Sequence, residues 1–340
     1  MRSTYLALSL AMALSIAALQ QNPTPAKQEV KQDKEPAAKS GASQSLALTL
    51  KGYETAKKFT LVAFGDLRIT DTSNHSATDP DMRLALIKQI AQEDPAAIII
   101  SGDLPWHGSN NKDWQVYEDE TKVWREKGTQ LYPALGNHEL SDNAQQGMEN
   151  WWAHFPELKP ARWYSARIGN CLLLTLDTNS KMGEGEPQTA WIKAQLAAIP
   201  NDVDFVIFSM HHPAYTDSHP SIEGGHSARK QEQEFGALLE SQPPAVRAKL
   251  LVIAGHVHNY ERFQHNGIFY LTSGGGGAQP YLFDRSADAL FKAPKSPIYH
   301  YVKITVNGGS LKAQVFQCNI TGNSTTFKLV DSFEMPAAGK

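Results

Sequence analysis

The sequence of 340 residues contains little cysteine and no run of basic residues. Only Cys171 and Cys318 are present, so paired thiolates of the kind that hold structural zinc are absent. The two thiols permit one disulfide or two buried free thiols, and both alternatives stay open. The 32 Lys and Arg nearly balance the 35 Asp and Glu, and no basic stripe is formed. We therefore expect no nucleic-acid partner.

Long apolar runs are also scarce. Residues Leu6 to Leu19 form one such run after Arg2, with the length of a secretory signal and too short for a comfortable membrane span. We predict a signal peptide over residues 1–19, with an uncleaved N-terminal anchor as the alternative. No later apolar run is long enough to cross a membrane. We expect a secreted or periplasmic protein with no stable membrane anchor after signal removal.

Residues 20–45 lack aromatic side chains and are rich in Pro, Ala, Lys, Gln, Glu and Ser. Such a segment cannot bury enough apolar surface to offset the entropy lost on ordering. We predict a flexible tether here and one catalytic domain over residues 46–335, since 41% of the chain is hydrophobic. The sequence gives no sign of the oligomeric state.

The folded part alternates apolar runs with helical segments. Asp79 is placed to cap a helix that begins at Pro80. Continuous apolar runs suit strands that are buried on both faces. Near the end, Asn307-Gly308-Gly309 is typical of a hairpin turn. We expect an α/β sandwich of two packed sheets with helices outside, the second sheet partly antiparallel. Strands are expected at 59–64, 96–100, 131–135, 171–176, 205–208, 250–253, 268–271, 301–306 and 311–316, and further helices at 187–198 and 230–241.

Residues that can bind metals follow five of these strands, most of them after a glycine. Ligands bind beyond the carboxyl ends of strands in sheets of this kind, so we expect these side chains to meet at one rim. A glycine before each ligand would let the backbone turn sharply. A mixture of Asp, Asn and His suits zinc, manganese or iron. The segments are Gly65-Asp66, Gly102-Asp103, Gly136-Asn137-His138, Met210-His211 and Gly255-His256-Val257-His258.

These segments, in this order, resemble the signature blocks of the calcineurin-like metallophosphoesterases. The resemblance covers roughly Phe59 to Thr272. The segments Asn259-Tyr260-Glu261-Arg262 and Met210–Tyr215 resemble the purple acid phosphatase branch. The resemblance implies a four-layer α/β/β/α sandwich with two mixed sheets, and two divalent or trivalent metal ions as cofactors.

The resemblance also implies a role for each position. Asp103 would bridge the two metal ions, and His138 would contact the phosphate and help to protonate the leaving group. A metal-bound hydroxide at the dinuclear site would attack phosphorus. The first metal would be held by Asp66 and His258, and the second by Asn137, His211 and His256.

Two positions depart from the pattern. Purple acid phosphatases have a Tyr ligand where this chain has Trp106, and other branches have a His where it has Arg68. The first metal therefore lacks a ligand, so we expect weak or exchangeable binding and no purple colour. Water, His75 or His107 are candidates for the gap. Arg68 would either hold a phosphate oxygen or pair with an acidic neighbour.

Other polar residues near these segments carry two interpretations each. His212 would face the substrate or point away from it. Tyr215, His219 and His226 belong to a polar loop, which is either a substrate wall or a mobile segment. Asp177 follows another strand and would support the site or cap a loop.

We therefore predict metal-dependent hydrolysis of a small-molecule phosphate ester by a phosphomonoesterase of the acid phosphatase type. A phosphodiesterase acting on nucleotide or lipid head-group diesters is the alternative, because the same metal core serves both reactions. A non-catalytic phosphate- or metal-binding protein is an alternative of another class. The presence of His138 argues against this binding protein, since a protein that only binds phosphate or metal needs no proton donor there.

Overall fold

The computed structural model describes residues 46–218, 226–241, 247–281, 285–292 and 298–337. The predicted signal peptide (1–19) and tether (20–45) lie outside the described residues. All described residues belong to one compact unit. Among its helices, none combines the length and the apolar character needed to cross a membrane.

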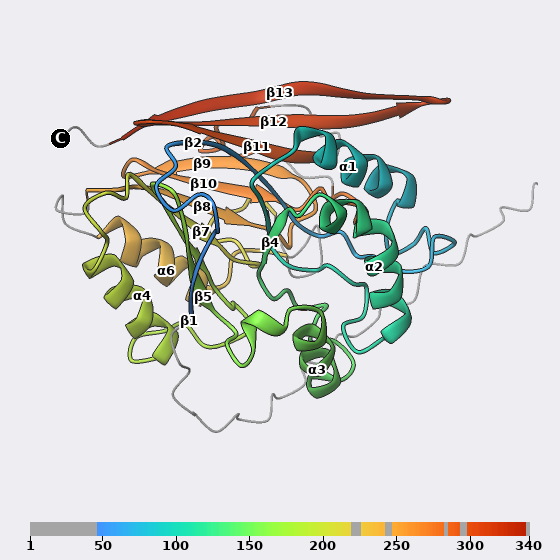
Figure 1. Cartoon of the computed structure of the whole chain (residues 1–340), viewed down its shortest axis with the longest axis horizontal. Coiled ribbons are helices and arrows are strands. Elements are labelled where there is room, and N and C mark those ends of the chain that lie inside the picture. Colours follow the sequence, from blue (N-terminus) through green and yellow to red (C-terminus); the bar gives the residue numbers. More distant parts are fainter. Residues whose placement is uncertain (1–45, 219–225, 242–246, 282–284, 293–297, 338–340) are drawn as a thin grey trace, which may run out of the picture. The chain divides into compact units, whose positions relative to one another are not determined.

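Two mixed β-sheets lie at the centre of this unit, as predicted (Figure 1). Within the described residues the first sheet has seven strands, in the spatial order β1 (Leu46–Thr49), β5 (Tyr164–Ile168), β6 (Cys171–Thr175), β7 (Phe205–Ser209), β8 (Lys249–Ala254), β10 (Ile268–Ser273) and β9 (Tyr260–His265). The second sheet has six described strands, in the order β13 (Ser324–Pro336), β12 (Ser310–Thr321), β11 (Tyr299–Asn307), β2 (Lys58–Phe64), β3 (Ala97–Ile100) and β4 (Gln130–Pro133).

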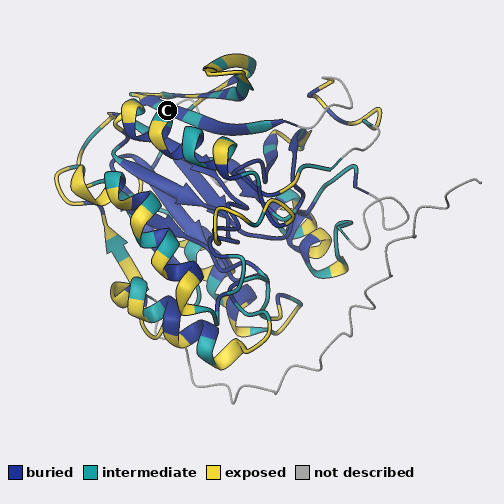
Figure 2. Ribbon diagram, turned by 90° about the vertical axis from the view of Figure 1, so that its right-hand side faces the viewer, coloured by how far each residue is buried: buried dark blue, intermediate teal, exposed yellow. Residues whose placement is uncertain are grey.

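Helices lie outside both sheets, so that the predicted four layers are confirmed. Figure 1 shows α4 and α6 on one side of the sheets and α1, α2 and α3 on the other. In Figure 2 the sheets are buried, and the helices expose only one face. The described helices are α1 (Pro80–Glu93), α2 (Asn111–Glu126), α3 (Ala144–His154), the short 3₁₀ helix η1 (Pro156–Leu158), α4 (Pro187–Ala197) and α6 (Lys230–Glu240).

The continuous apolar runs are explained by burial on both faces of each central strand. In β8, Leu251 and Ile253 join the core that is shared with the six-stranded sheet. The neighbouring Leu250 and Val252 pack instead in the core that contains Phe235 of α6. Because successive side chains of a strand point to opposite faces, each layer of the sandwich needs its own apolar set.

Two local predictions agree with the structure. The Asp79 carboxylate accepts a hydrogen bond from the Met82 N–H at 3.1 Å and caps α1 at Pro80. The β11–β12 hairpin turns at Gly308 and Gly309, where Asn307 pairs with Ser310. The late strands do not all belong to one sheet. β10 pairs with β8 in the seven-stranded sheet, whereas β11 and β12 belong to the six-stranded sheet.

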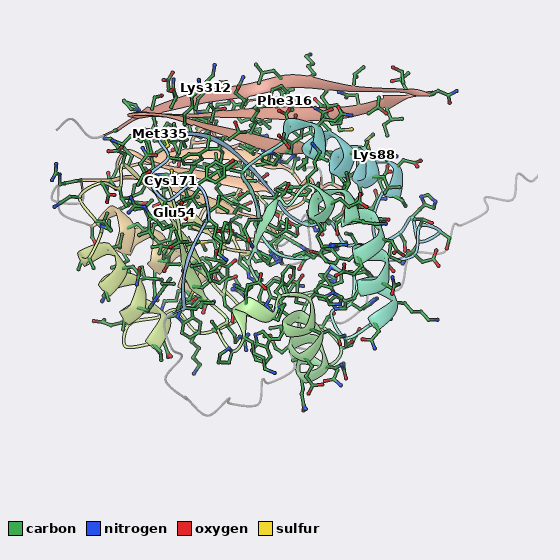
Figure 3. All side chains as sticks on the ribbon, in the orientation of Figure 1. Glu54, Lys88, Cys171, Lys312, Phe316 and Met335 are labelled. Atoms are coloured by element: carbon green, nitrogen blue, oxygen red, sulfur yellow. The ribbon has the colours of Figure 1, made fainter. Side chains whose placement is uncertain are left out.

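The two cysteines are free and buried. Cys171 lies on β6 in the seven-stranded sheet and Cys318 on β12 in the six-stranded sheet. Figure 3 labels Cys171 among the densely packed side chains of the interior. Of the two alternatives left open by the sequence, the structure therefore has two buried thiols.

Candidate metal centre

The five segments that carry the predicted ligands follow the carboxyl ends of strands from both sheets. β2, β3 and β4 are neighbours in the six-stranded sheet, and β7 and β8 are neighbours in the seven-stranded sheet. These strand ends belong to two sheets rather than to one, but the expected meeting of their side chains agrees with the structure. Their loops still meet, as the contacts below show.

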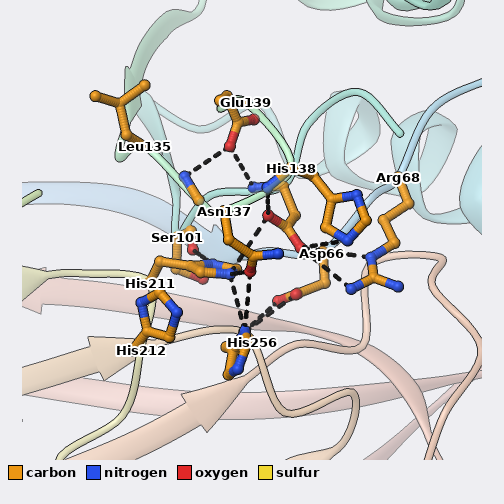
Figure 4. A network of polar contacts seen from close by, with 12 residues as sticks. Asp66, Arg68, Ser101, Leu135, Asn137, His138, Glu139, His211, His212 and His256 are labelled. Carbon is orange, nitrogen blue, oxygen red and sulfur yellow. Dashed lines mark hydrogen bonds and ion pairs between the residues drawn. The ribbon is translucent and has the colours of Figure 1, made fainter. Parts of the chain in front are cut away.

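One group of side chains consists of Asn137, His211 and His256, which approach one another closely. Asn137 Oδ1 lies 2.9 Å from His211 Nε2 and 3.1 Å from His256 Nδ1. The two ring nitrogens are 3.2 Å apart. Figure 4 shows the three side chains joined by these contacts. We call them the second group.

The His211 imidazole of the second group is oriented to offer a lone pair. The Ser101 carbonyl lies 2.8 Å from His211 Nδ1 and can only accept, so Nδ1 carries the proton and Nε2 faces Asn137. Burial lowers the pKa of His211 and holds the pKa of His256 well below its usual range. Neutral imidazoles next to an amide oxygen match the ligands of a divalent metal.

The other group consists of Asp66, Asp103 and His258, which we call the first group. One ligand atom from each lies within 4.8 Å of the others, and all three residues are buried. The Gln279 carbonyl lies 2.8 Å from His258 Nδ1, so His258 Nε2 faces the carboxylates. Nε2 is buried and has no hydrogen-bond partner within the described part of the chain. A cation would satisfy this nitrogen, so the first group also fits a metal.

Asp103 connects the two groups. Its Oδ1 lies 3.3 Å from His211 Nε2 in the second group, while the same carboxylate belongs to the first. Burial alone would raise the pKa of Asp103, but His211, His138 and Arg68 lower it overall. Burial and the negative charge of Asp103 hold the pKa of Asp66 well above its usual range. Two buried carboxylates with oxygens within 4.8 Å of each other are stabilised by a cation that binds between them.

The backbone at the site is strained at three candidate ligands and leaves no room for a side chain at Gly136. The candidate ligands Asp66, Asp103 and His256 themselves have positive φ angles, of 60°, 55° and 69°. Such angles are uncommon for residues other than glycine and are typical of strained functional sites. A Cβ on Gly136 would lie 2.2 Å from Asp103 Oδ1. Gly136 therefore leaves space for the carboxylate, rather than only permitting a turn as the sequence analysis expected.

His138 lies at the edge of both groups. Its Nδ1 contacts the Trp106 carbonyl at 2.6 Å, and its Nε2 lies 4.0 Å from Asp103 Oδ2. Its ring stacks on Trp106 with the centroids 4.8 Å apart. Burial lowers the pKa of His138 to about 4. The carbonyl fixes the ring so that Nε2 points into the site.

The neighbouring Glu139 has a role that the sequence analysis did not identify. Its carboxylate accepts hydrogen bonds from the backbone N–H groups of Asp103, Leu104 and Gly136, at 3.1, 2.7 and 2.6 Å. It therefore ties the loop after β3 to the loop after β4. Only its position after His138 signals this role in the sequence.

The two predicted substrate-binding residues occupy different surroundings. Arg68 lies 3.4 Å from Asp103 Oδ2, which matches the predicted pairing with an acidic residue. His212 is buried, and its Nδ1 lies 2.8 Å from Thr178 Oγ1. Its ring centroid lies 4.3 Å from that of His256, so it lines the second group rather than an open surface.

The candidates for the missing ligand do not join the first group. His107 lies 3.4 Å from Asp113 Oδ2, and its other nitrogen lies 3.7 Å from Asp142. His75 is exposed, and its carbonyl accepts a hydrogen bond from Gln279. Neither belongs to a potential metal-binding group of the described residues.

Two aromatic residues approach the site from later segments. His226 stacks on His256 at 4.6 Å between centroids, which places part of the predicted polar loop beside the second group. Tyr281 stacks on His258 at 4.3 Å, and its hydroxyl lies 3.1 Å from His226 Nε2. Tyr281 carries no sequence signal of this role. His219 lies outside the described residues.

Asp177 supports the second group indirectly. Its Oδ1 lies 3.2 Å from Asn179 Nδ2, which also donates to the carbonyl of Gly136 at 3.1 Å. Asp177 also pairs with Arg162 at 2.6 Å. Asp177 Oδ1 also accepts a hydrogen bond from the Asn179 N–H at 2.9 Å, so both predictions for Asp177, support of the site and capping of a loop, agree with the structure.

Comparisons with known proteins point to one family. A family model described as calcineurin-like phosphoesterase matches residues 59–260. Purple acid phosphatase 21 of Arabidopsis thaliana is 24% identical over 257 residues, which cover 68% of this chain and 54% of that protein. The chain thus spans about half the length of this curated relative.

Two solved structures share the fold. Purple acid phosphatase PPD1 from seeds of yellow lupin (Lupinus luteus) superposes with a TM-score of 0.67 and 20% identity, over 83% of this chain and 54% of that chain. GAP50, described as the anchor in the inner membrane complex of Plasmodium, superposes with a TM-score of 0.62 and 16% identity, over 84% of this chain and 90% of that chain. At these identities the similarity shows the fold alone.

Proposed function

The chain belongs to the calcineurin-like phosphoesterase family, and from this premise we propose that it hydrolyses phosphate monoesters with two bound metal ions. The observation that carries the proposal is the first group, in which buried Asp66 and Asp103 lie beside His258 Nε2. This buried nitrogen has no hydrogen-bond partner among the described residues. The second group adds Asn137 and two neutral imidazoles next to the same Asp103. Two adjoining ligand sets that share one carboxylate support a dinuclear centre.

Two cations held by these groups would neutralise the phosphoryl oxygens and lower the pKa of a coordinated water. The residues of the chain then bind and orient the substrate around them. Asp103 holds both groups together. His138 Nε2 points into the site, where it can contact a phosphoryl oxygen and, when protonated, donate to the leaving oxygen. Arg68 supplies a planar donor that suits a phosphate oxygen. Buried His212 has a ligand atom within 4.8 Å of those of His211 and His256, so it borders the second group.

The experiment is a metal add-back assay. The purified protein is stripped of metal and supplied separately with zinc, manganese or iron, in the presence of a chromogenic phosphate monoester or the matching diester. We expect metal-dependent turnover of the monoester, and its loss in Asp103→Asn. His138→Gln should retain bound metal but lose about 10²-fold or more in kcat, as expected for a general acid.

Each other outcome identifies a rival function. Faster turnover of the diester than of the monoester would replace the proposal by a phosphodiesterase. Bound metal without turnover of either ester would favour a phosphate- or metal-binding protein, for which His138→Gln should change little. Turnover that persists in Asp103→Asn would show that the chemistry takes place elsewhere.

We also propose that residues 1–19 direct export of the chain and that residues 20–45 tether the domain. The composition of these residues supports the proposal. The mass of the protein recovered outside the cytoplasm tests it, since a cleaved chain lacks the first residues. Recovery of the full-length mass, attached to the membrane, would favour an uncleaved anchor.

A further inference from the structure

The first group lies against a cation that belongs to the protein itself. Arg68 Nε and Nη2 each lie 3.4 Å from Asp103 Oδ2. The Arg68 side chain is only 10% exposed, and that of Asp103 is fully buried. A guanidinium carries a permanent positive charge. The carboxylate that joins the two groups therefore already has a positively charged partner.

The backbone holds Arg68 in this place. The segments after β2 and β3 run side by side, because the Arg68 N–H donates to the Asp103 carbonyl and the Trp106 N–H donates to the Ile69 carbonyl, both at 2.9 Å. Arg68 itself has a φ angle of 46°, which is uncommon outside glycine. Figure 4 shows its side chain pointing into the network beside His138.

Trp106 provides a surface for the charge. The Arg68 guanidinium carbon lies 5.1 Å from the centroid of the Trp106 ring, within the range of a cation–π contact. The Trp106 ring also stacks on His138. An indole cannot replace a metal ligand, but it stabilises a cation that stays next to the first group.

We propose that Arg68 and a metal ion in the first group compete for Asp103, so that the second group fills first and the first group binds metal weakly. This inference rests on the metal centre of the proposed function but not on hydrolysis. It differs from weakness caused by a missing ligand alone, because a resident charge opposes the metal. Removing that charge should strengthen binding although no ligand is added.

The electrostatics of the site favour this competition. A divalent ion and a guanidinium a few ångströms apart repel each other strongly where water is excluded. Arg68 acts on the other members of the first group too: after burial, its charge is the largest influence that lowers the pKa of His258. The 3.4 Å contacts are long for charge-assisted hydrogen bonds, so a metal can displace the guanidinium. A displaced Arg68 is then available to a phosphate oxygen.

The test is a calorimetric titration of the metal-free protein with Mn²⁺, without substrate. We expect one tight and one weak binding step in the wild type, and loss of the weak step in Asp66→Asn. Arg68→Gln should tighten the weak step by about tenfold or more, since a charge repulsion of the order of 1.4 kcal/mol is removed. Arg68→Lys keeps the charge and should leave the step weak. An unchanged tight step shows that each variant retains its fold.

Three outcomes would overturn the inference. Equal weak-step affinities in the wild type and Arg68→Gln would mean that the missing ligand alone weakens the first group. Equal tightening in Arg68→Gln and Arg68→Lys would assign the effect to side-chain shape and not to charge. No Mn²⁺ binding by any of the proteins would overturn the metal centre itself, and this inference with it.

Discussion

At the scale of single residues, the site depends on atoms that are almost in contact. A Cβ on Gly136 would lie 2.2 Å from Asp103 Oδ1 and 2.5 Å from the Asp103 nitrogen. Asp103 cannot move away freely, because its backbone N–H is held by Glu139 and its Oδ1 accepts the His138 N–H at 3.0 Å. One methyl group is therefore enough to displace the carboxylate that both groups share.

We therefore expect Gly136→Ala to lower the unfolding free energy by about 1–3 kcal/mol, the usual cost of overpacking, and to abolish metal-dependent turnover. Urea denaturation and the metal add-back assay measure the two effects. Gly183→Ala is the matched control, since its new Cβ would meet nothing nearer than 3.9 Å. Full activity of Gly136→Ala would show that Asp103 is not confined as described.

The same residues show how far a sequence can be interpreted. The ligand candidates stand out because each polar residue follows an apolar strand, and the structure brings Asp66, Asp103 and His258 together. Glu139 and Tyr281 do not stand out, because their roles depend on loops that meet only in the folded chain. The positive φ angles were likewise hidden, since they fall on Asp66, Asp103 and His256 themselves, and among the glycines before these segments only on Gly102.

At the scale of elements, β9 fixes the loop that follows β7. Glu261 of β9 accepts a hydrogen bond from the Asp217 N–H at 2.6 Å and another from the Thr216 hydroxyl at 2.7 Å. The loop is thereby held a few residues after His211. The polar segment that begins at Asn259 was recognised only by resemblance, whereas its strand and this contact became visible in the structure.

Glu261 makes this contact dependent on pH. Burial raises the pKa of its carboxyl to about 7, despite the two hydrogen bonds and the positive charge of Arg285, while the charge of Asp217 adds to the rise. The folded state thus holds the proton more tightly than the unfolded state, whose glutamate titrates near pH 4.3. This contribution to stability is complete below about pH 4 and is lost as the pH rises toward 7.

Glu261→Gln removes this titration. We expect the unfolding free energy of the wild type to fall between about pH 4.5 and 7 by up to about 3 kcal/mol more than that of the variant. Urea denaturation at several pH values compares the two slopes. Glu149→Gln, on the exposed surface of α3, should match the wild type. Parallel wild-type and Glu261→Gln curves would contradict a raised pKa.

At the scale of the whole molecule, each of the two groups of candidate ligands spans both sheets. The first takes Asp66 and Asp103 from the ends of β2 and β3, and His258 from the end of β8. The second takes Asn137 from the end of β4, and its imidazoles from the ends of β7 and β8. The sequence predicted both sheets but not their junction, because no local pattern tells which strand ends face each other.

Removal of metal should therefore loosen this junction more than the rest of the fold. Without a cation, Asp66 and Asp103 repel each other in a buried site, and His258 Nε2, 3.5 Å from Asp66 Oδ1, has no hydrogen-bond partner among the described residues. A metal at one hundred times its Kd stabilises the folded state by about 2.7 kcal/mol, so the metal-free protein should melt at a lower temperature.

Hydrogen exchange locates the effect. Amides at the carboxyl ends of β3 and β8 should exchange faster in the metal-free protein, whereas those of the β11–β12 hairpin, which supplies no ligand, should keep their rates. Asp103→Asn should reproduce the metal-free pattern even with metal present. A uniform change over all strands would instead mean that metal stabilises the fold globally, and unchanged rates would mean that the two sheets are held together by their shared apolar core alone.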